Sequence, residues 1–412
     1  MTGSRVGEGE RGGAGDLHLS RSPPLPLSGS SSPRSAYLHV PFCRHRCGYC
    51  NFTLVAGRDD LIEAYLDALA IELAALDNAA TSGRGPLEID TLFFGGGTPT
   101  HLSPAQFARL LTIAGGTFRL AAGGELSIEA NPADLASSTP AIRGGQGITR
   151  ISLGVQSFHP PKLALLERDH APDQIIAAFA LARRLAGSVS LDLIFGTPGE
   201  SLADWQRDLE LAMALNPDHI STYGLTFEKG TPFWSRLARG ELTQADEDLE
   251  RQMYELAIDT LTAAGFEHYE VSNFARPGHR CRHNEAYWTG KPYFAAGPGA
   301  ARFIGGRREI NHRSTTTYIQ RILAGQSPVA ESEQLGPEAA ARERLVFALR
   351  RMEGINVAQF AAETGFSVDF LSGKALPNLV ELGLLDQSSG HLRLTRAGLL
   401  VSDSIWPKFL RR

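Results

Sequence analysis

The sequence is poor in cysteine, lacks any long apolar run and carries no large excess of one charge. Four cysteines among 412 residues are too few for a disulfide framework, which favours a reducing compartment and free thiols. No apolar run approaches the roughly 20 residues that cross a bilayer. The 45 acidic and 40 basic side chains give a net charge of -5, which argues against a broad nucleic-acid-binding surface. We therefore expect a globular, cytoplasmic protein that does not bind nucleic acid.

The chain divides into four segments by composition and periodicity. Residues 1–35 are rich in glycine, serine and proline and predict a disordered tail. Alternating strand and helix patterns over residues 36–290 predict an α/β fold with parallel strands. The units number six or seven rather than eight, so we expect an open partial (β/α)6-type barrel. Residues 291–335 would connect this barrel to a small winged-helix-like domain of three helices and a hairpin over 336–412.

Three of the four cysteines lie within eight residues, in the stretch FCRHRCGYCNF. Cys43, Cys47 and Cys50 have the spacing C-x3-C-x2-C, which suits three thiolates around one inorganic core. Iron–sulfur clusters usually take four protein ligands, so three would leave one iron of a four-iron cluster open to another molecule. A structural zinc site, with His45 or a remote residue as the fourth ligand, is the alternative that the spacing leaves open.

Glycines and polar residues mark the ends of several predicted strands. The glycines at 95–97 follow an apolar strand, where a ligand or another backbone segment must come close, although such a run is also typical of a tight turn. Glu129, Gln156 and Asp192 lie in or near the ends of later, largely apolar strands. A polar side chain there either binds a ligand or ties the barrel together. Because the C-terminal strand ends form the active mouth of an α/β barrel, we expect the glycines and the cysteine loop at the same mouth.

The stretch from Tyr37 to Phe52 and the sequence GGGTP resemble the radical S-adenosylmethionine (SAM) superfamily, in its coproporphyrinogen dehydrogenase-like (HemN-like) branch. The resemblance covers about residues 36–410. It implies that the three cysteines hold a [4Fe–4S] cluster whose open iron is chelated by SAM, and that reduction of the cluster cleaves SAM to a radical. Without the resemblance, the sequence LLERDH would predict that Arg168 is an ordinary solvated charge. The implied SAM contacts are Tyr37 and Tyr49 beside the cluster, Gly96, Gly97 and Thr98 at the methionine end, and Glu129, Gln156, Arg168 and Asp192.

Two features separate the members of this branch. The dehydrogenase carries a further cysteine two residues after its cluster motif, where this chain has Phe52. The heme-chaperone family of the branch carries H-N-x-x-Y-W, and HNEAYW supplies His283, Asn284, Tyr287 and Trp288 here. The resemblance implies that these residues bind heme, whose iron a histidine nitrogen can ligate. From the residues alone, the alternative is a structural turn with Trp288 in the core.

Neither the fourth cysteine nor the C-terminal helices suggest a further site. Cys281, two residues before the motif, is expected to be a small buried core residue rather than a ligand. No C-x-x-C-H motif is present, so covalent c-type heme attachment is not indicated. Residues 373–384 carry one lysine and one glutamate, too few donors for a DNA-recognition helix.

The expected function is that of a heme chaperone, which binds heme and transfers it to apo-hemoproteins with the support of a [4Fe–4S] cluster and a SAM site. The alternative is a radical SAM enzyme that acts on a porphyrinogen. Phe52 argues against coproporphyrinogen dehydrogenase activity, and no catalytic residue is assigned. The implied partners are heme and apo-hemoprotein recipients, and the resemblance is compatible with a homodimer and with peripheral membrane contact.

Overall fold

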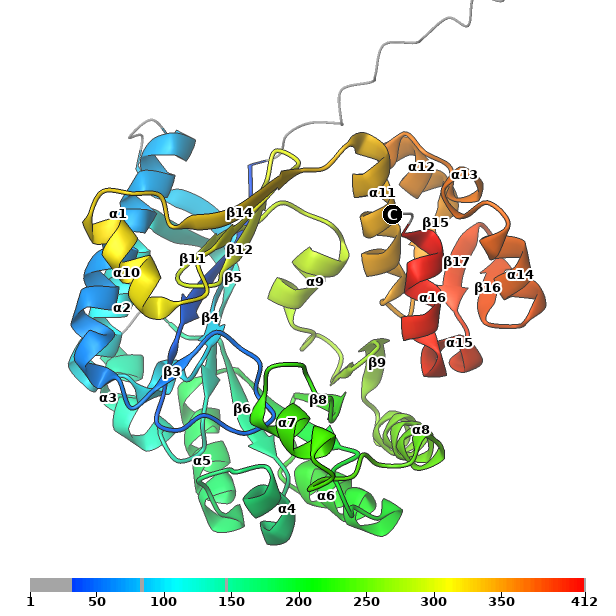
Figure 1. Cartoon of the computed structure of the whole chain (residues 1–412), viewed down its shortest axis with the longest axis horizontal. Coiled ribbons are helices and arrows are strands. Elements are labelled where there is room, and N and C mark those ends of the chain that lie inside the picture. Colours follow the sequence, from blue (N-terminus) through cyan, green and yellow to red (C-terminus); the bar gives the residue numbers. More distant parts are fainter. Residues whose placement is uncertain (1–31, 82–84, 145–146, 411–412) are drawn as a thin grey trace, which may run out of the picture.

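The computed structural model describes residues 32–81, 85–144 and 147–410, whose arrangement is shown in Figure 1. Most of the expected disordered tail, residues 1–31, lies outside the described residues. None of the helices in the described ranges combines the length and the apolar character needed to cross a membrane.

A nine-stranded sheet forms the centre of the fold, in the order β11-β1-β4-β5-β6-β7-β8-β10-β9. The strands from β11 to β8 in this order pair in parallel, whereas β10 pairs antiparallel with both β8 and β9. Because β11 and β9 end the order without pairing with each other in the described ranges, the sheet is an open partial barrel. The strands are β1 (Ser35–Val40), β4 (Leu87–Gly96), β5 (Phe118–Ala130), β6 (Arg150–Gln156), β7 (Ser188–Phe195), β8 (His219–Gly224), β9 (Glu267–Glu270), β10 (Asn273–Ala275) and β11 (Phe294–Ala296).

Six parallel strands each lead into a helix on the outer face of the sheet, directly or after shorter elements (Figure 1). This arrangement confirms the expected (β/α)6-type partial barrel. Ser103 shows how the sequence starts such a helix: its hydroxyl accepts from Gln106 N at 3.3 Å, and the Gln106 side chain accepts from Ser103 N at 3.1 Å. The helices after β1, β4, β5, β6, β7 and β8 are α1 (Ile62–Thr81), α2 (Pro104–Thr117), α3 (Leu135–Gly144), α5 (Pro172–Leu185), α6 (Leu202–Ala214) and α8 (Glu247–Ala263).

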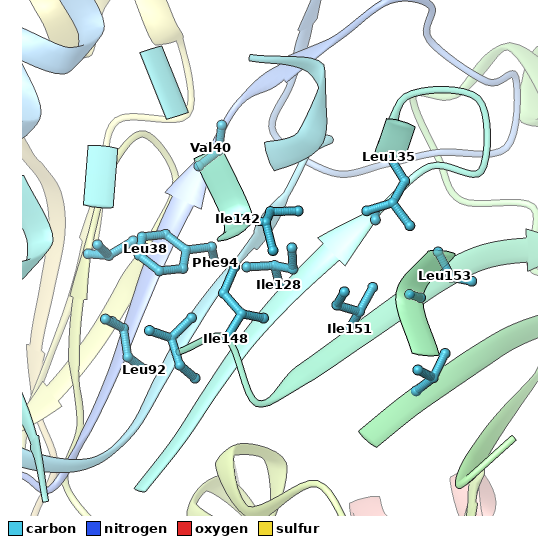
Figure 2. Packing of buried hydrophobic residues seen from close by; sticks show 14 of the residues in the cluster. Leu38, Val40, Leu92, Phe94, Ile128, Leu135, Ile142, Ile148, Ile151 and Leu153 are labelled. Atoms are coloured by element: carbon cyan, nitrogen blue, oxygen red, sulfur yellow. The ribbon is translucent and has the colours of Figure 1, made fainter. Parts of the chain in front are cut away.

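The face of the sheet that meets these helices is apolar. Side chains at alternate positions of a strand point to the same face. Leu38, Phe94, Ile128 and Leu153 come from four neighbouring strands and are fully buried in one cluster with helix residues (Figure 2). Burial of each such side chain contributes about 1.5–3 kcal/mol. Apolar packing is therefore concentrated on the outer face, and the inner face is available for polar groups.

The segment expected to connect the two units has structure of its own. β11 lies in it and extends the main sheet beside β1. Glu72 of α1 is buried and accepts hydrogen bonds from Gly297 N at 2.9 Å, Asn311 Nδ2 at 2.7 Å and the Tyr318 hydroxyl at 2.7 Å. These three donors satisfy the buried carboxylate and fix the segment against the first helix of the barrel. Its other elements are β12 (Ala301–Ile304), β13 (Arg307–Asn311), α10 (Thr315–Leu323) and β14 (Val329–Gln334).

The C-terminal part is helical with a small three-stranded sheet, which agrees with the expected winged-helix-like domain (Figure 1). Glu270 at the end of β9 is fully buried and accepts from Arg350 Nε at 2.8 Å. Val271 N donates to Arg350 O at 3.1 Å, and Met352 N donates to Tyr269 O at 3.2 Å. The domain is thus attached to the last strand of the barrel. Its elements are α11 (Pro337–Leu349), β15 (Ile355–Asn356), α12 (Val357–Thr364), α13 (Val368–Ser372), α14 (Ala375–Glu381), β16 (Leu385–Ser388), β17 (His391–Leu394), α15 (Arg396–Leu400) and α16 (Ser402–Phe409).

Candidate functional site

The cysteine loop follows β1 and is held down by α7 (Pro232–Ala238). Phe233 N donates to Gly48 O at 2.9 Å, and a Cβ atom on Gly48 would lie 2.6 Å from the Phe233 ring. Only glycine fits at this position. Within the loop, Cys50 N donates to Cys47 O at 3.1 Å, and the Tyr49 ring packs edge-on against Phe233. The loop therefore has a fixed conformation.

The thiols of this loop lie among hydrogen-bond donors. Cys43 Sγ is 3.3 Å from the Thr98 hydroxyl oxygen, and Cys47 Sγ accepts from Arg168 Nη1 at 3.6 Å. Burial raises the pKa of Cys43 to about 12 and also raises the pKa of Cys50. A thiol in this setting becomes a thiolate only when a cation stabilises it. The donor set therefore fits an iron–sulfur core, which carries the positive metal charge that these thiols need.

The zinc alternative fits these residues less well. In the part of the chain that the structure describes, no three side chains of His, Cys, Asp or Glu are grouped to hold a single metal ion. His45, the proposed fourth zinc ligand, is 46% exposed, and its Nε2 lies 3.9 Å from Glu167 Oε2. In a multi-iron core each thiolate binds a different iron atom, so the thiols need not converge on one point.

The glycine run at the end of β4 lies directly beside the cysteine loop. Gly97 N donates to Val40 O at 2.8 Å, and Thr98 N donates to Phe42 O at 2.8 Å. A Cβ atom on Gly97 would lie 2.7 Å from Phe42 O, while one on Gly96, whose φ is +107°, would lie 2.3 Å from the His39 ring. The backbone of the cysteine segment excludes a side chain at position 97, and the His39 ring together with the positive φ excludes one at position 96. The two motifs thus meet at the C-terminal mouth of the sheet, as the sequence predicted.

Two half-buried carboxyl groups, those of Glu129 and Asp192, face the interior of the barrel below this mouth. Glu129 Oε2 accepts from Gly96 N at 2.9 Å, and Asp192 accepts from the Ser152 hydroxyl at 3.0 Å. Burial raises the pKa of Glu129 to about 7 and raises the pKa of Asp192 above its usual value. Such carboxyl groups ionise readily when a cationic ligand group binds beside them.

Gln156 ends β6 with a strained backbone. Its φ is +65°, which is rare for a residue with a side chain and is concentrated at functional sites. The next two residues are anchored to Asp208 of α6: the Ser157 hydroxyl and Phe158 N each donate to its carboxylate at 2.7 Å. Lys162 Nζ, also buried, donates to the same carboxylate at 3.0 Å. This network holds the strained residue in place.

Sequence patterns alone did not identify Arg168 as a site residue. It is not a solvated charge, because its Nη2 donates to Gly154 O at 2.9 Å and its Nη1 donates to Cys47 Sγ. Its Nε is buried and has no hydrogen-bond partner among the described residues. A buried donor left unpaired costs about 1–3 kcal/mol, so a bound ligand that accepts from this atom would offset that cost.

The HNEAYW sequence forms α9 (Arg282–Trp288), which lies between the main sheet and α11 (Figure 1). His283 is only 1% exposed. Its Nδ1 lies 2.9 Å from the Thr91 hydroxyl oxygen, and its Nε2 lies 2.8 Å from the Tyr287 hydroxyl oxygen. The ring stacks on Phe93 with centroids 5.1 Å apart, and burial lowers the pKa of His283 to about 3. The imidazole is therefore neutral, with both nitrogens engaged.

The N-terminus of α9 is fixed by Glu125 of β5. This carboxylate accepts from Arg282 N at 3.2 Å and from His283 N at 3.1 Å, which satisfies two unpaired donors of the helix start. Trp288 is buried against Tyr269, as the structural alternative for this motif supposed, and Asn284 is half-buried. Cys281 is buried, as expected from the sequence.

Tyr37 connects the mouth of the sheet with α9. Its hydroxyl oxygen lies 3.0 Å from His39 Nδ1. Its ring centroid lies 6.4 Å from that of His283 and 6.0 Å from that of Phe93. The residues predicted to contact SAM and those predicted to contact heme thus share one wall of the barrel interior.

Comparisons with known proteins agree with this architecture. Residues 37–212 match the radical SAM superfamily, and residues 335–401 match the HemN C-terminal domain. The chain is 34% identical to the heme chaperone HemW of Bacillus subtilis, over 92% of this chain and 99% of that protein. It is 38% identical to heme chaperone HemW of Mycobacterium tuberculosis, over 93% of this chain and 98% of that protein.

A mitochondrial relative and a solved structure extend these similarities. The radical S-adenosyl methionine domain-containing protein 1 of Bos taurus is 34% identical over 95% of this chain and 90% of its own length. The solved structure of coproporphyrinogen III oxidase (HemN) from Escherichia coli superposes with a TM-score of 0.81, over 93% of this chain and 92% of that one. The sequence identity to that enzyme is 23%, so the match speaks for the fold alone.

Proposed function

This chain belongs to the HemW family of radical SAM proteins, and from this membership we propose that it binds heme and transfers it to apo-hemoproteins. The observation that carries the proposal is the position of α9, whose His283 packs within 6.4 Å of Tyr37, measured between ring centroids, at the wall of the predicted SAM site. Heme held by α9 would therefore adjoin the SAM site. All four cysteines are free thiols, which supports a reducing, cytoplasmic location.

We propose that Cys43, Cys47 and Cys50 hold a [4Fe–4S] cluster. This cluster supplies one-electron chemistry and an open iron for SAM when bound. Thr98 and Arg168 are the hydrogen-bond donors to sulfur that would stabilise the thiolates. The half-buried thiols and the absence of side chains on the facing glycines support this assignment.

The SAM site would lie between the glycine run and the polar interior. The half-buried carboxyl groups of Glu129 and Asp192 would accept from cationic or hydroxyl groups of SAM. The Nε of Arg168, which has no partner among the described residues, would donate to one of the acceptors of SAM. The strained Gln156 would present its amide at the strand end. Tyr37 and Tyr49 would line the site, and Gly96, Gly97 and Thr98 would meet the methionine end.

Heme would bind at α9, with His283 as the iron ligand and Asn284, Tyr287 and Trp288 around it. In the structure His283 Nε2 is bonded to Tyr287. Ligation therefore requires α9 to turn this ring away from its partner. The neutral state of the buried imidazole supports the assignment, because only an unprotonated nitrogen binds iron.

A transfer experiment tests the chaperone function. Heme-loaded, cluster-reconstituted protein is mixed with increasing concentrations of apo-forms of b-type hemoproteins from the same cell, and the Soret band of the acceptor is followed. Direct transfer predicts a rate that rises with acceptor concentration. A rate that stays at the spontaneous heme dissociation rate at every acceptor concentration would show passive release and contradict the proposal.

The porphyrinogen-enzyme alternative is tested in the same preparation. Phe52, in place of the further cysteine of the dehydrogenase, argues against it. We expect no turnover when coproporphyrinogen III, SAM and a reductant are supplied together. Conversion of this substrate would contradict the chaperone function and support the enzymatic alternative.

A further inference from the structure

A large apolar side chain is exposed immediately after the cysteine loop. Phe52 is 58% exposed. The backbone on both sides of it is fixed, because Thr53 O accepts from His39 Nε2 at 2.6 Å and Asn51 O accepts from Arg313 Nη2 at 2.8 Å. The exposure of Phe52 is therefore set by the fold, since its neighbours cannot move to bury it without breaking these contacts.

Two arginines flank Phe52. Arg46 Nη2 donates to Phe52 O at 3.2 Å, and Arg313 Nε donates to the Thr53 hydroxyl oxygen at 3.2 Å. Both arginines are exposed, and neither belongs to an ion pair within the described ranges, unlike Arg44, which pairs with Asp134 at 2.5 Å. Their two positive charges stand out on a chain with a net charge of -5.

Aromatic and arginine side chains are enriched in protein interfaces, and rigid aromatic side chains often dominate their binding energy. The surface formed by Phe52, Arg46 and Arg313, here called the Phe52 surface, has this composition. Its uncompensated positive charge fits an acidic partner protein. A partner on this surface would lie beside the cysteine loop, because Cys50 is only two residues before Phe52 and is itself half-buried.

We propose that the Phe52 surface docks an acidic one-electron carrier protein of the ferredoxin type, which reduces the cluster. This inference rests on the [4Fe–4S] cluster of the proposed function. A carrier seated on Phe52 would bring its own redox centre next to Cys50. In the step the reduced iron–sulfur centre of the carrier loses one electron and the cluster gains it, while no bond forms or breaks in this chain.

The test compares a protein reductant with a small one. Cluster-reconstituted protein is mixed anaerobically with a reduced acidic [2Fe–2S] ferredoxin, and cluster bleaching is followed by stopped-flow absorbance. We expect the double variant Arg46→Glu/Arg313→Glu to slow reduction about tenfold or more at low salt. Phe52→Ser should slow it on the order of tenfold. Dithionite needs no docking surface and should reduce all variants at the wild-type rate.

A charge reversal at the other end of the sheet is the matched control. Arg119, the second residue of β5, has a side chain that is 66% exposed. Arg119→Glu should leave the rates of reduction by ferredoxin and by dithionite unchanged. Binding of the oxidised ferredoxin, measured by calorimetry, gives a second readout, and its affinity should fall in the same variants. The Phe52-surface variants could be reduced normally by dithionite and also keep the wild-type rate of reduction by ferredoxin and the wild-type affinity for it. That result would overturn the docking surface alone. A preparation that binds no iron–sulfur cluster would instead overturn the proposed function and this inference with it.

Discussion

His283 and Tyr287, one helical turn apart on α9, are joined by a 2.8 Å contact between the imidazole Nε2 and the phenol oxygen. The other ring nitrogen contacts Thr91 of β4 at 2.9 Å. Neither nitrogen is therefore free in this conformation. Under the proposed function, Tyr287 occupies the nitrogen that heme iron would take, so heme must compete with an internal hydrogen bond.

Replacing Tyr287 with phenylalanine should strengthen heme binding. The change keeps the ring but removes the hydroxyl that competes for His283 Nε2. A net hydrogen bond contributes about 1 kcal/mol, so we expect heme affinity to rise about fivefold in an absorbance titration. As a control, His283→Ala/Tyr287→Phe should show no such gain. Weaker heme binding in Tyr287→Phe would indicate that the hydroxyl itself contacts the ligand.

Alanine at position 48 should destabilise the cysteine loop. Its Cβ atom would lie 2.6 Å from the Phe233 ring, and such overpacking costs about 1–3 kcal/mol. We expect urea unfolding of the cluster-free Gly48→Ala protein to show this loss, and reconstitution to yield less iron per chain. Adding Phe233→Leu should restore part of the stability, because the two sites share one contact. Additive losses in the double variant would rule out this steric explanation.

Stability should fall as the pH falls below neutrality, and His268 should contribute to that slope. Its ring stacks on Phe274 with centroids 4.3 Å apart, and burial lowers its pKa from 6.5 to about 4. Between these two values the unfolded chain binds a proton that the folded chain does not, so this histidine stabilises the fold above pH 6.5 and loses that contribution as the pH approaches 4.

The His268→Gln variant tests this contribution. The free energy of unfolding, measured in urea from pH 7 to pH 5, should fall less steeply with decreasing pH than in the wild type, by up to about 1.4 kcal/mol per pH unit. His391→Gln, on the exposed hairpin of the C-terminal domain, is the control. A slope equal to that of the wild type would contradict the role assigned to His268.

Removing the carboxylate of Glu270 should loosen the C-terminal domain. Glu270 is fully buried and pairs with Arg350, which is itself partly exposed. Breaking a buried ion pair by changing one partner costs on the order of 3 kcal/mol. We expect Glu270→Gln to lower the free energy of unfolding by about this amount and to speed hydrogen exchange at the amide of Met352.

An exposed ion pair provides the comparison for this variant. Arg396 and Asp259 also link the C-terminal domain to the barrel, but both side chains are largely exposed. Asp259→Asn should therefore cost less than about 1 kcal/mol. Equal losses in Glu270→Gln and Asp259→Asn would show that burial does not distinguish the two contacts.

The sequence allowed the mouth of the barrel to be predicted, because parallel strands place the segments after them at one edge. Cys43 and Thr98 accordingly meet there. The contact between Arg168 and Cys47 could not be predicted from pattern, since 121 residues separate them and no periodicity marks the pair. The same holds for Glu125 and His283, 158 residues apart. Such contacts depend on how α9 and the strand ends pack in the complete sheet.

A heme titration of the cluster-reconstituted protein tests whether His283 of α9 ligates heme. Absorbance is recorded for the wild type, for His283→Ala and for His219→Ala, the last a buried histidine outside the motif whose two nitrogens contact Ser190 and Tyr269. We expect a saturable Soret band near one heme per chain that weakens in His283→Ala and persists in His219→Ala. Absence of specific binding in the wild type, or unchanged binding in His283→Ala, would contradict heme ligation at α9.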